Sequence, residues 1–304
     1  PQEHRVGFAQ PIPWFGKLSL KGEIADSEAK AALYAFLAKK NKLVASVTDA
    51  YFELAYLRSA TEITDANFEL LKRWEQVLSQ RYRAQTGTQA NLIKVQVELG
   101  TLEDKLKELK DLEAPLLARF NALLNRETFK QVAIPESVLE AFPDKSIRRA
   151  LALDQQALEA QLSQNNPDLL YVDALIEARN SGIELAHKNF YPDFGVGADY
   201  VFVGDRAQAG GESGDDALVA MFSISLPLYR SKYEAGLSQA KSQKRSAEQM
   251  KKAKKYALSS QLAKSIFEIK DSKRRVKLYK HTLVPKAEES LDSTYTAFEA
   301  GESS

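Results

Sequence analysis

The chain has 304 residues, of which 44% are hydrophobic and 27% are charged, so it carries enough apolar side chains for a folded core. Lysine and arginine total 42 against 41 for aspartate and glutamate, and this balance provides no electrostatic attraction for nucleic acid. Cysteine is absent, which excludes disulfides, thiolate metal sites and a cysteine nucleophile.

No stretch approaches the roughly 18 consecutive apolar residues of a membrane-spanning helix, so membrane contact would have to come from strands or a surface helix. The chain begins Pro1-Gln2-Glu3-His4, without an initiator methionine and without the charged and then apolar start of a signal peptide. We therefore expect that Pro1 is not the natural start.

Three segments of about ten residues, 6–14, 194–203 and 218–228, alternate with the period of a strand that has one apolar face. Their even-numbered positions carry the larger apolar side chains, whereas the odd-numbered positions include glycine, serine and aspartate. Strands of this length suit a tilted crossing of a bilayer. An ordinary antiparallel sheet packed on a helix alternates in the same way.

Residues 204–216 between two of these segments are polar and rich in glycine, which predicts a hairpin loop in water. If this loop is external, aromatic residues gather at the opposite ends of the strands and would form a girdle at the inner interface. The candidates are Trp14, Phe15, Phe190, Tyr191 and Tyr229, together with the aliphatic Leu228.

A very long helix is expected after the first strand, because residues 25–82 contain no proline and only sequence compatible with a helix. At 1.5 Å per residue such a helix would extend about 85 Å, a length that a compact domain does not need. This length favours the membrane-strand interpretation over a small packed sheet.

The returning segment has apolar residues spaced mostly by alternating threes and fours, which predicts a coiled-coil seam. They are Leu92, Val95, Leu99, Leu102, Leu106, Leu109, Leu116, Phe120 and Leu123. Pro115 is expected to kink or interrupt this helix. The link at residues 86–90 is short, so the two helices form an antiparallel hairpin with Gly87 at its tip.

The second half of the chain returns to the same plan. Residues 126–166 lose the long period and predict a collar of small helices. Asn166-Pro167-Asp168 opens a helix that leads to the second strand. After the third strand, residues 231–298 predict another very long helix, with Pro285 as its interruption.

An internal repeat connects the halves at an offset of 214 residues (227 minus 13). Residues 8–15 align with residues 222–229 through a shared pattern of phenylalanine, proline and a final aromatic, and Gly22 then falls on Gly236. Sequences rich in helix show some self-similarity by chance. The aligned core, however, is not a helical pattern, which favours duplication.

This order of strand, long helix, tip, returning helix and collar, followed by the same elements again, resembles the TolC-like outer-membrane efflux family. Local sequence carries the resemblance as well, in Asn166-Pro167-Asp168, in Phe190-Tyr191-Pro192-Asp193, and in residues 224–229 before the descending helix. The resemblance implies a mainly helical fold with membrane β-strands, in which long antiparallel coiled-coil helices continue from a transmembrane β-barrel and two internal repeats form each subunit.

On this basis residues 1–304 are one protomer fragment, with the end of repeat 1 in residues 1–125, an equatorial collar in 126–166, and repeat 2 in 167–304. Repeat 2 holds a helix, a strand hairpin at 192–229 and a long helix to its tip, and we expect its return helix to be missing. A fourth strand would precede Pro1.

The function that the resemblance implies is a passive exit duct of a tripartite efflux system, in the outer membrane with a long periplasmic extension. The expected partners are two further copies of the chain, a periplasmic adaptor protein, an inner-membrane pump and outer-membrane lipid. A type I secretion duct of the same fold is one alternative. A soluble coiled-coil scaffold is another, and an exposed apolar band on the strands would argue against it.

Site residues follow from the strand parity and the hairpin. The expected lumen-facing residues are Gly195, Gly197, Asp199, Ser223 and Ser225, and the expected lipid-facing residues are Phe194, Tyr200, Phe202, Phe222 and Ile224. Thr86, Gly87, Thr88 and Gly301 are expected at the tips, side by side and about 100 Å from the membrane, where an adaptor could dock. A glycine also suits the end of any helix, so a plain turn is the alternative.

We expect no catalytic, cofactor or metal site. His4, His187 and His281 are far apart in sequence and lack the spacing of a zinc site, and Gly195-x-Gly197 is not followed by a helix that could bind a pyrophosphate. No pair of acidic residues in an apolar setting suggests acid and base catalysis. Residues 10–17 look like a segment of the cobalt-zinc-cadmium efflux branch of the family, although Met221 and Met250 are the only thioethers.

Overall fold

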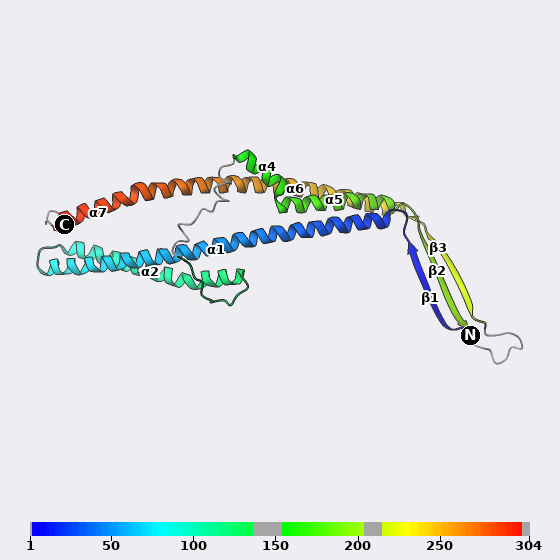
Figure 1. Cartoon of the computed structure of the whole chain (residues 1–304), viewed down its shortest axis with the longest axis horizontal. Helices are drawn as coiled ribbons and strands as arrows, with labels where there is room; N and C mark the ends of the chain where they lie inside the picture. Colours follow the sequence, from blue (N-terminus) through cyan, green and yellow to red (C-terminus); the bar gives the residue numbers. More distant parts are fainter. Residues whose placement is uncertain (1, 136–153, 204–214, 300–304) are drawn as a thin grey trace. The chain divides into compact units, whose positions relative to one another are not determined.

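The computed structural model describes residues 2–135, 154–203 and 215–299, and these form two compact units. The first unit comprises residues 1–38 and 159–260, and the second comprises residues 39–158 and 261–304. Two of the longest helices contribute to both units, and Figure 1 follows the chain through them.

A three-stranded antiparallel sheet occupies one part of the first unit, in the order β1 (Gln2–Ile12), β2 (Asp193–Val203) and β3 (Ala217–Ser225) (Figure 1). The three predicted strands are thus confirmed. The register pairs Phe8 with Ala198 and Ala198 with Ala220, so residues of even number lie opposite one another across the sheet. Even-numbered side chains of all three strands therefore share one face, and odd-numbered side chains share the other.

Two strands end earlier than the sequence pattern predicts. β1 stops at Ile12 and β3 at Ser225, so Trp14 and Leu228 lie outside the sheet. The cause is a proline just beyond each strand, Pro13 and Pro227, because proline has no N–H to donate to a neighbouring strand.

Helices continue from the sheet in the first unit. α1 (Lys17–Arg83) begins directly after Gly16, whose φ of 84° turns the chain out of the strand. α5 (Pro167–Lys188) begins as predicted, with the Asn166 side chain accepting a hydrogen bond from the backbone N–H of Asp168 at 2.9 Å. A shorter helix, α4 (Gln155–Asn165), precedes it.

α5 packs along the start of α6 (Arg230–Leu278), as Figure 1 shows. Lys251 and Lys254 of α6 pair with Asp173 and Asp168 of α5, each at 2.5 Å. α5 also carries buried apolar side chains, among them Leu169 and Val172.

In the second unit, α1 and α2 (Gln89–Leu123) form the predicted antiparallel hairpin. All nine predicted seam residues of α2 are buried or half-buried, which confirms the coiled-coil period. The core joins Ala50, Leu54 and Leu57 of α1 to residues of α2, namely Leu109, Leu116, Leu117 and Phe120. The helix is not interrupted at Pro115, and the buried Leu116 and Leu117 that follow it contribute to stabilising a helix that lacks one backbone hydrogen bond.

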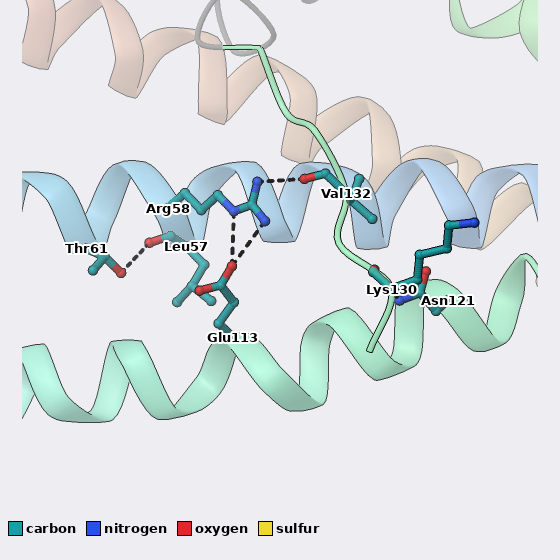
Figure 2. Close-up of polar contacts among 7 residues, drawn as sticks. All are labelled: Leu57, Arg58, Thr61, Glu113, Asn121, Lys130 and Val132. Carbon is teal, nitrogen blue, oxygen red and sulfur yellow. Dashed lines mark hydrogen bonds and ion pairs between the residues drawn. The ribbon is translucent and has the colours of Figure 1, made fainter. Parts of the chain in front are cut away.

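The chain leaves α2 by folding back over this core (Figure 2). The buried Asn121 amide donates to the backbone carbonyls of Thr128 and Lys130 at 3.0 and 2.8 Å. Arg58 of α1 donates to the carbonyl of Val132 at 2.8 Å and pairs with Glu113 of α2 at 3.1 Å. These polar contacts fix the first residues of the predicted collar, of which residues 136–153 lie outside the described part of the chain.

The second long helix is interrupted where the sequence predicts. α6 gives way to a π-helical segment, Tyr279–Leu283, before α7 (Val284–Glu299) continues the path. Pro285 explains the position of this interruption. In a regular α-helix the proline ring would clash with the carbonyl of His281, and proline has no N–H to donate to that carbonyl.

The two repeats are visible in the element order. A strand is followed by a long helix twice, at α1 from Lys17 and at α6 from Arg230, which are 213 residues apart (230 minus 17). This spacing agrees with the sequence offset of the repeat within one residue.

The turn between α1 and α2 closes with paired backbone hydrogen bonds. The N–H of Thr86 donates to the carbonyl of Arg81 at 2.9 Å, and the N–H of Gln85 donates to that of Tyr82 at 3.0 Å. This is a Schellman motif, in which the left-handed residue is Gln85, with φ of 59°, and not Gly87. A Cβ at Gly87 would lie 3.1 Å from the Cβ of Arg81, so a side chain there would require a shift of a few tenths of an ångström.

Candidate functional site

One face of the sheet is apolar and exposed. Its most exposed large side chains are Phe8, Leu218 and Phe222, which are 69%, 75% and 73% exposed. The lipid-facing candidates lie on this even-numbered face and are exposed or half-buried, namely Phe194, Tyr200, Phe202, Phe222 and Ile224. An exposed apolar surface of this kind marks contact with lipid or with another protein.

The opposite face is built of small residues. The lumen candidates Gly195, Gly197, Asp199, Ser223 and Ser225 all lie on this odd-numbered face, together with Ala9, Pro11 and Met221. A hollow of about 540 Å³ lies over its small residues. At Gly197 a Cβ would approach the carbonyl oxygen of Phe8 to 3.1 Å, so glycine permits close strand packing there.

Asp199 differs from the other residues of the small-residue face. It is 5% exposed and forms an ion pair with Arg5, whose side chain is 52% exposed. Its carboxylate lies over Gly7, its cross-strand partner, because a Cβ at Gly7 would collide with it at 1.6 Å. Arg5 also approaches the sulfur of Met221 to 3.9 Å. The guanidinium is therefore the more exposed charge of the pair.

Aromatic residues gather where the strands meet the helices. Trp14 stacks on Tyr191 at 5.2 Å and lies 5.7 Å from Phe15, edge to face. Phe190 contacts Tyr233 of α6 at 5.8 Å, whereas Tyr229 is 80% exposed. Lys17 anchors the same region with an ion pair to Asp193 at 2.8 Å, and the backbone N–H of Trp14 donates to that carboxylate at 2.7 Å.

The tip candidates belong to the second unit. Thr86 is exposed, and the Thr88 side chain caps α2 by accepting a hydrogen bond from the N–H of Asn91 at 3.4 Å. Gly301 lies outside the described residues. Phe298 of α7 is described, and its ring lies 3.7 Å from the guanidinium of Arg81, which also donates to its carbonyl at 3.2 Å.

A second aromatic contact accompanies this one. Trp74 of α1 meets Tyr295 and Phe298 of α7 edge to face, at 5.7 and 5.2 Å. These residues border an open hollow of about 480 Å³ that Leu70, Val77 and Leu291 also line. The end of α1 and the end of α7 are therefore held together by aromatic and cation contacts.

Among residues 2–135, 154–203 and 215–299, no group of three histidine, aspartate or glutamate side chains is placed to hold a metal ion. The three histidines lie in β1, in α5 and in the π-helical segment. None of the helices in these ranges is both long and apolar enough to cross a bilayer.

Sequence reasoning missed two contacts between distant parts of the chain that bear on the candidate site. Arg5 and Asp199 are 194 residues apart, and the register that brings them together follows only from the pairing of β1 with β2. Trp74 and Phe298 stand on different helices, and no periodicity within either helix identifies the other as the partner. The one feature of the sequence that pointed to the pairing of Arg5 with Asp199 is that both positions are odd-numbered.

Comparison with protein families gives one match. The family model described as outer membrane efflux protein matches residues 149–304, about half of the chain. Among curated proteins, none matches the sequence.

Solved structures of similar fold are outer-membrane channels. The outer membrane protein VceC of Vibrio cholerae has a TM-score of 0.81 and 19% identity over 99% of this chain and 70% of its own. The open-state channel MtrE of Neisseria gonorrhoeae has a TM-score of 0.75 and 16% identity, with 99% and 71% covered. CusC, described in terms of folding and transmembrane channel formation, has a TM-score of 0.78 and 14% identity, with 99% and 68% covered.

The strand sheet, the long helical hairpin and these likenesses define a TolC-like channel fold. The chain belongs to the outer membrane efflux protein family.

Proposed function

We propose that the protein is a subunit of an outer-membrane efflux channel, a passive exit duct that makes and breaks no bond. The single observation that carries the proposal is the sheet with two contrasting faces, one exposed and apolar and one of small residues. A transmembrane barrel strand needs this contrast, because one face meets lipid and the other meets water. Family membership supports the same role.

The sheet also favours assembly with further strands. In the order β1, β2, β3, the outer edges of β1 and β3 have no partner strand among the described residues. A sheet edge in hydrocarbon would leave backbone N–H and C=O groups without hydrogen bonds, at several kcal/mol for each group. Closure by strands of other copies removes both edges, and a homotrimer in the outer membrane is the proposed arrangement.

The proposal is tested by fractionation and by conductance of the protein expressed from its own gene. We expect it in the outer-membrane fraction, soluble only with detergent, and we expect stepwise conductance after insertion into planar bilayers. A protein that stays soluble without detergent and gives no conductance would instead be a coiled-coil scaffold. A deletion strain would separate the metal, drug and type I secretion alternatives. Poor survival on cobalt, zinc and cadmium salts would indicate metal export, poor survival on organic toxins would indicate drug export, and loss of a secreted protein would indicate type I secretion.

The turn between α1 and α2 is the proposed docking point for a periplasmic adaptor, which would connect the duct to an inner-membrane pump. Residues 84–86 are exposed, and the neighbouring ends of α1 and α7 are joined through Arg81, Trp74 and Phe298. Paired helix ends of this kind can extend a coiled coil into a partner hairpin.

Thr86→Arg is expected to lower efflux about tenfold or more, which corresponds to about 1.4 kcal/mol of adaptor binding. Thr86 is chosen because a side chain at Gly87 would crowd Arg81 and because Thr88 caps α2. Thr101→Arg is the matched control, since Thr101 is also exposed and its hydroxyl also donates to a backbone carbonyl. Equal efflux in both variants, at equal amounts in the membrane, would show that the turn binds no adaptor.

A further inference from the structure

The ion pair between Arg5 and Asp199 is the charged feature of the small-residue face that the duct proposal does not use. Around it, the described odd-numbered positions of β2 and β3 carry glycine, valine, alanine, methionine and serine, apart from Asp193 at the start of β2. Asp193 is already engaged by Lys17 and by the N–H of Trp14. From Arg5 to Ile12, the other odd-numbered positions of β1 are Gly7, Ala9 and Pro11. Over this part of the face the Arg5 and Asp199 pair is therefore the main charged feature apart from Asp193.

The two charges of the pair are unequally placed. The Asp199 side chain is 8% exposed and lies in the space over Gly7 that a Cβ would otherwise fill. The Arg5 side chain is 52% exposed and comes from the neighbouring strand. The carboxylate is thus held against the sheet while the guanidinium projects from it, so a solute that passes along this face meets positive charge first.

We propose that Arg5 is a charge-selecting residue of the duct and that Asp199 is its positioning residue. A fixed cation on the wall of a water-filled pore attracts anions and repels cations, as rings of arginine or lysine do in anion pores. The strand region would then favour solutes with net negative charge. The inference rests on the proposed function, because it requires that the small-residue face lines the conduction path.

Reversal potentials in planar bilayers under a potassium chloride gradient test the inference. Asp199→Asn removes the compensating carboxylate and should raise the ratio of chloride to potassium permeability at least about twofold, the effect of one charge across about 8 Å of water. Arg5→Gln should shift the ratio toward potassium by a similar factor. The double variant, in which a neutral glutamine faces a neutral asparagine, should lie below the wild type in chloride preference.

Controls keep a failure of the inference distinct from a failure of the duct proposal. Val201→Thr changes the residue paired with Arg5 in the register without adding charge, and it should leave the ratio unchanged. Should Arg5→Gln leave a buried carboxylate that prevents assembly, Asp199→Asn and the double variant still carry the test. Conductance with the same permeability ratio in wild type, Asp199→Asn and the double variant would overturn the inference alone. A wild type without conductance would overturn the proposed function.

Discussion

Phe222→Lys is expected to lower the amount of protein in the outer membrane at least tenfold. Phe222 is 73% exposed on the apolar face, in the middle of β3, and pairs with Val196 across the sheet. A lysine that faces lipid near the centre of the bilayer destabilises a barrel by about 2–4 kcal/mol. The measurement is quantitative immunodetection in separated inner and outer membranes.

Ser223→Lys is the matched control for this substitution. Ser223 is the next residue of the same strand, and its side chain lies on the small-residue face. In the proposed duct, a lysine there would remain in water. We expect its membrane level to equal that of the wild type. Equal loss in both variants would mean that the two faces meet the same environment, and this outcome would contradict the lipid-facing assignment.

Leu54→Ala is expected to lower the free energy of unfolding by about 2–5 kcal/mol. Leu54 is 0% exposed and lies in the core of the second unit, where α1 meets Leu116 and Phe120 of α2. Removing its side chain loses apolar burial and leaves a cavity between two helices that relax only in part. Urea denaturation of the detergent-solubilised protein, followed by circular dichroism, measures the change.

Leu43→Ala supplies the comparison within the same helix. Leu43 is 46% exposed in the described chain, so its replacement should change the free energy of unfolding by less than about 1 kcal/mol. A cost as large as that of Leu54→Ala would place Leu43 in a contact with another copy of the chain.

Local periodicity predicted most of this fold. The alternation in β2 separates two faces of a strand, and the spacing of threes and fours in α2 defines one apolar face of a helix. The structure shows the strand and the helix with these faces where the pattern predicted them. The predicted strand ends at Trp14 and Leu228 were wrong, because the side-chain pattern continues past Pro13 and Pro227, which cannot donate a backbone hydrogen bond.

Part of the candidate site could likewise be predicted from local periodicity, and part could not. Parity alone separates Phe222 from Ser223, because neighbouring residues of a strand point to opposite faces. The pairing of Arg5 with Asp199 depends on register between strands that are distant in sequence, and the aromatic contacts of Trp74 depend on how two helices lie together. Neither is encoded in the spacing of residues along one element.

The left-handed conformation of Gln85 lowers the stability of the turn between α1 and α2. Outside glycine, the left-handed conformation costs about 1–2 kcal/mol, so the closed turn is weaker by that amount than a glycine turn would be. A difference of 1 kcal/mol multiplies the open fraction about fivefold. The closed hairpin therefore opens at Gln85 more readily than the same turn with glycine at that position would.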